Sequence, residues 1–168
     1  FTGPNLRAAG VDYDVRVMTP YSSYEDFDFI IPIGTQGDTY DRFCVREEEM
    51  WQSLSIIRQA LDKMPKTNEF FADVPEFYLP PKDAVYNTME GLIWHFKIVM
   101  GEVNVPKGQV YHCVEGGNGE LGFYLVSDGG RQPFRLHFRR PCFIYYQAYP
   151  EMIKGALLSD AIITMSSM

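Results

Sequence analysis

A glycine-rich turn with a glutamate at each end stands out among the segments that could do chemistry. It runs from Glu115 to Glu120, and three of its six residues are glycine. A phosphate-binding loop would need Lys and Ser or Thr directly after the glycines, and a dinucleotide site would need a helix there. Apolar alternating segments, 109–114 and 121–126, flank the turn instead. This pattern predicts a β-hairpin, and its two carboxylates disfavour a bound phosphate.

The three histidines are spread over the sequence. His95 falls in an expected helix, whereas His112 and His137 fall in expected strands and could face each other across a sheet. None of them has the HxxxH or HxxEH spacing of a metal site. We therefore predict no metal site and identify no catalytic residue in this segment.

An acidic run, Glu47 to Glu49, follows two basic residues, Arg42 and Arg46. At helical spacing these side chains are expected to form a solvated, charge-paired face. The alternative is a set of buried carboxylates that transfer protons, which would require raised pKa values.

Composition indicates a globular segment of one domain. The 168 residues are 46% hydrophobic and 15% aromatic, and the formal net charge is -7, which disfavours non-specific binding to nucleic acid or to an anionic membrane surface. The apolar runs are far shorter than the roughly 20 residues that a membrane-spanning helix needs. Three widely separated cysteines form no CxxC motif and are expected to be buried thiols; they are Cys44, Cys113 and Cys142.

Two long amphipathic helices are predicted, at about 38–64 and 82–100, and we expect their apolar stripes to pack on each other. The first is expected to begin at an Asp38 cap and to end before Pro65, and the second to end at Gly101. The stripe of the first helix consists of Phe43, Met50, Leu54, Ile57, Leu61 and Met64. That of the second consists of Val85, Met89, Leu92, Phe96 and Val99.

The remaining elements complete an α+β fold. A small antiparallel sheet is expected at about 109–138, a short edge strand at 27–33, and a final apolar helix from about Leu157. The connector 65–81 is expected to pack through Phe70, Phe71, Phe77 and Tyr78. We interpret 1–168 as a single segment of one domain that is incomplete at both ends.

Several strings, in order, resemble the D subunits of the proton-pumping NADH:quinone oxidoreductase, respiratory complex I, which are related to nickel-iron hydrogenase large subunits. The strings include TGPNLRAAGVDYDVR (2–16), GDTYDRFCVREEEMWQSLSIIRQALDKMP (37–65), GELGFYLVSDGG (119–130) and PEMIKGALLSDAI (150–162). The resemblance implies a hydrogenase-like fold and a scaffold that forms part of the quinone-cavity wall. Its quinone-binding His and Tyr would precede Phe1.

The glycine-rich turn resembles the EAPRGELG-type hairpin of that family, which lies near the quinone cavity. Candidate residues adjacent to the cavity are therefore Glu115, Asn118, Gly119 and Glu120. At 116–118, Gly-Gly-Asn replaces the usual Ala, Pro and basic residue, and a structural turn is favoured over direct contact with quinone.

The resemblance also implies partners and cofactors. The complex would use FMN, iron-sulfur clusters, NADH and quinone, with no cofactor bound by this segment itself, and the chain would bind quinone and other complex I subunits as partners. It would lie peripherally at the cytoplasmic face of a bacterial inner membrane, or at the matrix side of the mitochondrial inner membrane. Alternatives are the large subunit of a membrane-bound nickel-iron hydrogenase, which needs four cysteine ligands, or a non-catalytic interaction module of the same fold.

Overall fold

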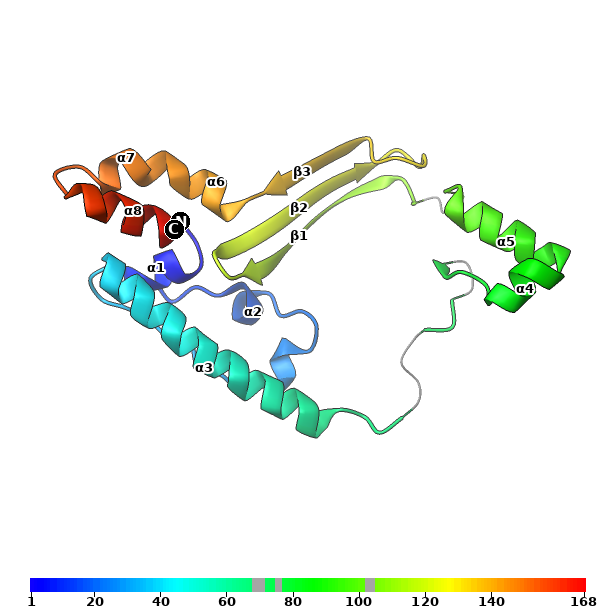
Figure 1. Cartoon of the computed structure of the whole chain (residues 1–168), viewed down its shortest axis with the longest axis horizontal. Helices are drawn as coiled ribbons and strands as arrows, with labels where there is room; N and C mark the ends of the chain where they lie inside the picture. The colour runs from blue at the N-terminus through cyan, green and yellow to red at the C-terminus, as the bar shows by residue number, and fades with distance from the viewer. Residues whose placement is uncertain (68–71, 75–76, 102–104) are drawn as a thin grey trace. The chain divides into compact units, whose positions relative to one another are not determined.

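The structure is a computed structural model that describes residues 1–67, 72–74, 77–101 and 105–168. Its elements include α1 (Pro4–Ala8), α2 (Val15–Met18), α3 (Thr39–Lys63), α4 (Lys82–Asn87), α5 (Met89–Val99), β1 (Gly108–Gly116), β2 (Gly119–Ser127), β3 (Arg135–Arg139), α6 (Pro141–Tyr145), α7 (Tyr149–Met152) and α8 (Leu158–Ser166). Short 3₁₀ turns lie at Tyr24–Asp26 and Tyr146–Ala148. Figure 1 shows these elements and confirms the α+β class.

The contacts divide the chain into two compact units. The first unit comprises Phe1–Met64, Tyr111–Phe123 and Phe138–Met168, and the second comprises Pro65–Val110 and Tyr124–His137. The expectation of one domain stays a prediction. None of the helices within the described ranges is long and apolar enough to cross a membrane.

Helix α3 begins and ends where the sequence predicts. The carboxylate of Asp38 accepts a hydrogen bond from the backbone amide of Asp41 at 2.8 Å and caps the first turn. The helix ends at Lys63, two residues before Pro65, because proline cannot continue the backbone hydrogen bonding.

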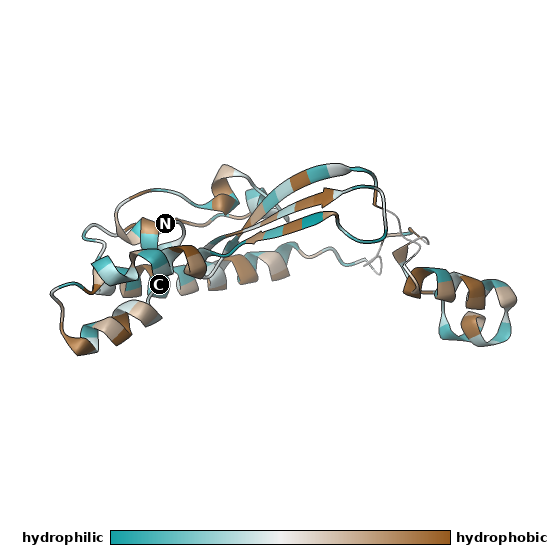
Figure 2. Cartoon of the chain, turned by 90° about the horizontal axis from the view of Figure 1, so that it is seen from above, coloured by the Kyte–Doolittle hydropathy of each residue, from teal (hydrophilic) through white to brown (hydrophobic). Residues whose placement is uncertain are grey.

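The orientation of α3 differs from the prediction. Its apolar stripe is exposed along the whole helix, from Phe43 at 62% exposed to Leu61 at 62%, and Figure 2 shows apolar residues at intervals along the long helix. The buried side instead carries Val45 and Arg42, and this side of α3 packs on α1. The expected mutual packing of the two apolar stripes stays a prediction, because α3 and α5 belong to different units.

The second predicted helix, 82–100, is wrong as a single element. It breaks at Thr88, whose backbone is extended and whose hydroxyl accepts a hydrogen bond from the amide of Gly91 at 3.1 Å. Thr88 is therefore an N-cap that starts α5 as a new helix. The two helices approach so closely that a Cβ at Gly91 would lie 2.4 Å from the carbonyl oxygen of Ala84. Gly101, with φ +83°, ends α5 as predicted.

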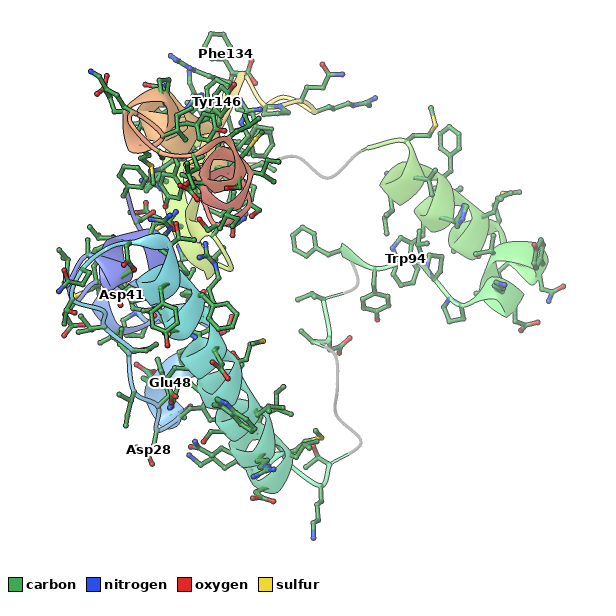
Figure 3. The ribbon with its side chains drawn as sticks, turned by 60° about the vertical axis from the view of Figure 1, so that its left-hand side comes forward. Asp28, Asp41, Glu48, Trp94, Phe134 and Tyr146 are labelled. Atoms are coloured by element: carbon green, nitrogen blue, oxygen red, sulfur yellow. The ribbon has the colours of Figure 1, made fainter. Side chains whose placement is uncertain are left out.

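In the second unit, the connector packs in part as expected. Tyr78 contacts Trp94, with the ring centroids 5.7 Å apart, and Figure 3 shows Trp94 projecting from α5. Phe77 is exposed. Phe70 and Phe71 lie outside the described residues.

The predicted sheet at about 109–138 is confirmed, with bounds of Gly108–Ser127 for the hairpin and Arg135–Arg139 for the third strand. Its strands pair in the order β1-β2-β3. Because β2 lies between the other two, His112 on β1 and His137 on β3 are not neighbours, and the expected facing pair is wrong.

The predicted edge strand at 27–33 is also wrong. This segment forms no strand, and side chains of α3 satisfy its backbone instead. The side-chain amide of Gln59 accepts from the backbone N–H of Asp28 at 2.9 Å and donates to its carbonyl at 2.7 Å. Gln52 accepts from the N–H of Ile30 at 3.1 Å. The alternating pattern therefore reflects an extended segment that lies on a helix.

Candidate functional site

The glycine-rich turn is held in place by the chain's first residues and by α6. Gly119 has φ +127°, and a Cβ there would lie 2.3 Å from the hydroxyl of Tyr145 and 2.8 Å from that of Thr2. Only glycine fits this backbone and this space. Tyr145 is 1% exposed; its hydroxyl donates to the carbonyl of Thr2 at 2.6 Å and accepts from the backbone N–H of Thr2 at 2.9 Å. The Thr2 hydroxyl in turn accepts from the backbone N–H of Glu120 at 3.1 Å.

Glu115, at the start of the turn, is paired with Arg7 inside the first unit. Its side chain is 5% exposed, and one oxygen accepts from Arg7 Nη1 at 2.9 Å. The other oxygen accepts from the backbone N–H of Val15 at 3.3 Å, and the backbone N–H of Glu115 donates to the hydroxyl of Tyr21. Burial raises the pKa of Glu115, and the charge of Arg7 offsets only part of this effect.

Arg7 is the centre of the cluster. Its side chain is 1% exposed, and it donates through Nε and Nη2 to Glu49 at 2.9 and 2.6 Å and through Nη1 to the carbonyl of Tyr13 at 2.9 Å. Burial alone would lower the pKa of Arg7, but the charges of Glu49 and Glu115 raise it above its ordinary value. The guanidinium therefore stays charged.

A second pair adjoins this centre. Arg16 donates to Asp14 with Nη2–Oδ2 at 2.6 Å, and the side chain of Asp14 is fully buried. Asp14 also caps α2 and lies 3.4 Å from Arg7 Nη1. Burial alone would raise the pKa of Asp14, but the hydrogen bonds and charge of Arg16 lower it below its ordinary value.

These residues form what we call the Arg7 cluster, which consists of Arg7, Asp14, Arg16, Glu49 and Glu115. It holds two cations and three carboxylates, so the fully ionised cluster carries one excess negative charge. A proton on Glu115, whose pKa is raised, would remove this excess.

Glu120, at the other end of the turn, is bonded to two phenols. It accepts from the hydroxyl of Tyr111 at 2.8 Å and from that of Tyr13 at 3.3 Å. Arg139 donates to its backbone carbonyl at 2.7 Å. Burial and the carboxylate of Glu120 raise the pKa of Tyr111 to about 12. Both phenols therefore remain protonated donors at neutral pH.

Tyr13 joins the two ends of the turn. Its carbonyl accepts from Arg7, which binds Glu115, and its hydroxyl donates to Glu120. Gly122 contributes by leaving room for Tyr111, because a Cβ there would lie 2.3 Å from the Tyr111 hydroxyl. The structure thus links Glu115 and Glu120 in one hydrogen-bonded network, and Gly119 packs against Thr2 and Tyr145 beside it.

Asn118 is not part of this network. It is exposed at the tip of the turn, and its side-chain amide donates to the sulfur of Cys142 at 3.2 Å. The expectation of buried thiols is wrong in this structure: Cys142 is exposed, and Cys44 and Cys113 are half-buried. Among the described residues, no group of three or more His, Cys, Asp or Glu side chains could hold a metal ion.

Sequence reasoning missed most of the Arg7 cluster. Glu47 and Glu48 are exposed, as expected of a solvated face, and Figure 3 labels Glu48 on α3. Glu49 differs, because it pairs with Arg7 from a distance of 42 residues in sequence. The only local signal was Asp14 followed by Arg16, which is typical of a helix cap.

The comparisons with known proteins cover the whole chain. The model of the family described as "Respiratory-chain NADH dehydrogenase, 49 Kd subunit" matches residues 1–168. The chain belongs to this family. It is 77% identical over its whole length to the D subunit of NADH-quinone oxidoreductase from Flavobacterium johnsoniae, 58% to that from Leptospira biflexa, and 50% over 99% of its length to that from Myxococcus xanthus.

Membership of the 49 kDa subunit family confirms the resemblance based on the ordered strings and the hydrogenase-like α+β class. Nothing in the comparisons favours a hydrogenase, since these three relatives are all named as D subunits of NADH-quinone oxidoreductase. The chain spans about two fifths of the length of these relatives, 40 or 41% of each.

Proposed function

We propose that this chain acts within the D subunit of a proton-translocating NADH:quinone oxidoreductase and supplies scaffold and part of the quinone-cavity wall. The observation that carries this proposal is the family match over residues 1–168. We further propose that these residues belong to one domain of the parent protein.

In this proposal the glycine-rich turn supports the quinone-cavity wall without contacting quinone directly. The candidates Glu115, Gly119 and Glu120 are each bonded to, or packed against, other parts of the first unit, which favours a structural role over direct contact with quinone. Asn118 is the exception, because it is exposed at the tip. A rigid wall keeps the substrate oriented, and small displacements of such a wall reduce the rate.

The two carboxylates also offer proton-holding groups. Reduction of a quinone to the quinol takes up two electrons and two protons, so groups near the cavity must deliver protons. Glu115, with its raised pKa, and the Glu120 carboxylate with its two phenol donors have the chemistry for this. We propose that these two carboxylates bind and release the protons that quinone reduction requires.

The wider assignment follows from the same family. We propose that neighbouring complex I subunits hold the FMN and the iron-sulfur clusters, and that the chain is a peripheral part of a membrane-bound complex. The location that we favour is the cytoplasmic face of a bacterial inner membrane, since the three relatives are bacterial.

The test is a Glu120→Gln variant in the assembled complex. We expect quinone reduction by NADH to fall at least about threefold, since Gln keeps the shape but loses the charge that orders Tyr111 and Tyr13. NADH oxidation by a soluble acceptor that bypasses quinone should not change. The matched control is Glu151→Gln, whose side chain is 79% exposed. Equal loss with both acceptors, or no loss with quinone, would refute the proposed role.

A further inference from the structure

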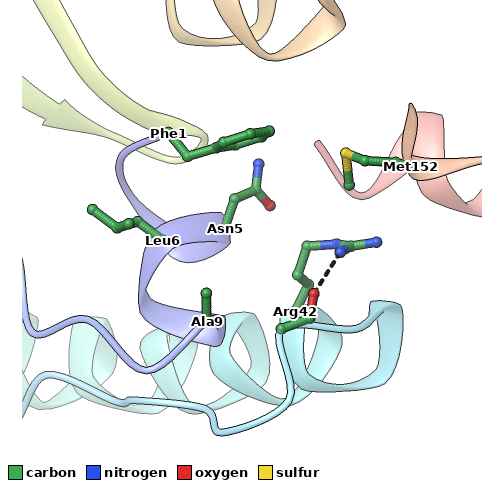
Figure 4. Close-up of a pocket in the computed structure, with 7 residues that line it drawn as sticks. Phe1, Asn5, Leu6, Ala9, Arg42 and Met152 are labelled. Carbon is green, nitrogen blue, oxygen red and sulfur yellow. Dashed lines mark hydrogen bonds between the residues drawn. The ribbon is translucent and has the colours of Figure 1, made fainter. Parts of the chain in front are cut away.

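A cavity of about 220 Å³ lies within the first unit, between α1, the start of α3 and α7. It is separate from the Arg7 cluster. Its lining is mostly apolar but includes one amide and one guanidinium. The lining residues are Phe1, Asn5, Leu6, Ala9, Gly37, Arg42 and Met152, and Figure 4 shows them around the open space.

Asn5 has a hydrogen-bond donor without a partner. The residue is 7% exposed, and its Nδ2 is a buried atom that bonds to no acceptor among the described residues. Its Oδ1 accepts from Nη2 of Arg46 at 3.5 Å, which turns the nitrogen away from α3. Figure 4 shows this nitrogen on the side of Phe1, toward the cavity. A buried donor without an acceptor destabilises the folded state, so an acceptor is expected opposite it.

Two arginines beside Asn5 have no carboxylate partner at ion-pair distance among the residues that the structure describes. Arg42 is 5% exposed and donates only to neutral acceptors, namely the Gly37 carbonyl and the hydroxyls of Thr39 and Ser167. These three bonds leave two of its five N–H groups free. Burial and the nearby charge of Arg46 lower the pKa of Arg42, although Asp38 acts against this from a longer distance.

Buried guanidinium groups normally pair with an anion, because an isolated buried charge is costly. One unmet amide donor and the guanidinium of Arg42, both lining the same cavity, favour an acceptor that carries a negative charge. A planar carboxylate fits both the guanidinium and the amide. At roughly 30 Å³ per water molecule, the volume exceeds what a single ordered water fills.

We propose that this cavity binds the carboxylate of an acidic side chain from the part of the parent polypeptide that lies outside residues 1–168. Both ends of the described chain lie beside it. Phe1 lines the cavity, Ser167 bonds to Arg42, and Figure 1 shows the two termini together next to α1. The relatives are more than twice as long, so covalently linked chain is present at high effective concentration. This site does not depend on the proposed role in quinone reduction.

The first test is an Asn5→Asp variant of the full-length protein in its complex. The bond from Arg46 is kept, but the donor that faces the cavity is lost and a like charge meets the bound carboxylate. We expect the melting temperature of the protein to fall by several degrees. Gln132→Glu, the same amide-to-acid change at an exposed position, should leave it unchanged. An empty or water-filled cavity predicts the opposite, because an Asp between two arginines would keep or raise the melting temperature.

A second measurement keeps the proposal testable if Asn5→Asp fails to fold. Carbodiimide with an added amine labels accessible carboxylates, and the labelled peptides are then mapped. In Arg42→Gln we expect labelling of one Asp or Glu outside residues 1–168 to rise several-fold relative to the unaltered complex. The control is Arg58→Gln on the exposed side of α3. Unchanged labelling of every carboxylate outside this range would overturn the proposal. So would a melting temperature of the unaltered complex that rises with added sodium acetate, since a free anion would then occupy the cavity.

Discussion

At the scale of single residues, Arg7 determines how the turn is held. Its guanidinium binds acceptors from three separate segments, namely the Tyr13 carbonyl, Glu49 on α3 and Glu115 on β1. Because the side chain is buried, these contacts are little screened by salt. The balance of charge around it then depends on the protonation of Glu115, whose pKa is raised mainly by burial.

Glu115→Gln should therefore change how stability depends on pH. A raised pKa in the folded state means that ionisation of Glu115 costs folding free energy as pH rises above its ordinary value of 4.5. Gln does not titrate. Over a pH range that rises from about 4.5, the free energy of unfolding should therefore fall in the unaltered protein relative to the variant. Urea unfolding of both proteins across this range measures it. A difference that stays constant or moves the other way would contradict the assignment.

Tyr145→Phe should weaken the clamp on the glycine-rich turn, by which we mean the contacts of Tyr145 and Thr2 with Gly119 and Glu120. The change removes the hydroxyl that bonds to both backbone groups of Thr2 and leaves the buried N–H of Thr2 without an acceptor. We expect a loss of about 1–3 kcal/mol of unfolding free energy. Tyr146→Phe is the control, because Tyr146 is adjacent in sequence but 57% exposed. Equal effects of the two changes would rule out the clamp.

At the scale of elements, α3 supports other parts of the first unit. Its buried side carries Val45 and packs on α1, and the helix supplies Glu49 to the Arg7 cluster. On its flank, the amide side chains of Gln52 and Gln59 bond to the backbone of the segment at 27–33. The helix thus replaces the neighbouring strand that this extended segment lacks.

Removal of the Gln59 side chain should weaken the hydrogen bonding that α3 provides to the backbone of segment 27–33. In Gln59→Ala, the backbone N–H of Asp28 loses its acceptor, so its hydrogen exchange should become about five- to tenfold faster, as expected for the loss of roughly 1 kcal/mol. The N–H of Ile30, which Gln52 holds, should change much less. Exchange measured by NMR or mass spectrometry tests this. Equal rates for Asp28 in both proteins would contradict it.

The sequence was informative about elements wherever a local signal decides them. The Asp38 cap, the stop before Pro65 and the Gly-rich hairpin each depend on a few adjacent residues, and the structure has them as predicted. The break at Thr88 was missed because the apolar stripe continues through this position and predicts one helix, although Thr is also a residue that caps helices. The Arg7 cluster was missed for a different reason: it joins residues up to 108 positions apart, and no local pattern marks such pairs.

At the scale of the whole molecule, the exposed apolar side chains fit a chain that spans 41% of the length of the Flavobacterium johnsoniae relative. Leu54, Ile57 and Leu61 on α3 are each 46–62% exposed, in one stripe. Contiguous apolar surface of this kind marks an interaction site or promotes aggregation.

Residues 1–168 expressed alone should therefore self-associate and bind an apolar dye. Replacing Leu54 and Leu61 by Gln should reduce both effects by about half or more, since it interrupts the stripe. Replacing the polar neighbours Arg58 and Asp62 by Gln and Asn should change neither. Light scattering and dye fluorescence measure the outcome, and equal behaviour of the two double variants would show that the stripe is not responsible.

The central claim is that the clamped turn holds the quinone-cavity wall in position, and Gly119→Ala tests it most directly. A Cβ at Gly119 collides with Tyr145 and Thr2, whereas a Cβ at Gly117 meets nothing within 4 Å. The measurement is the rate of quinone reduction by NADH in assembled complexes, relative to the rate with an acceptor that bypasses quinone. The account predicts that this ratio falls at least about fivefold in Gly119→Ala and stays unchanged in Gly117→Ala. An unchanged ratio in an assembled Gly119→Ala complex would contradict it.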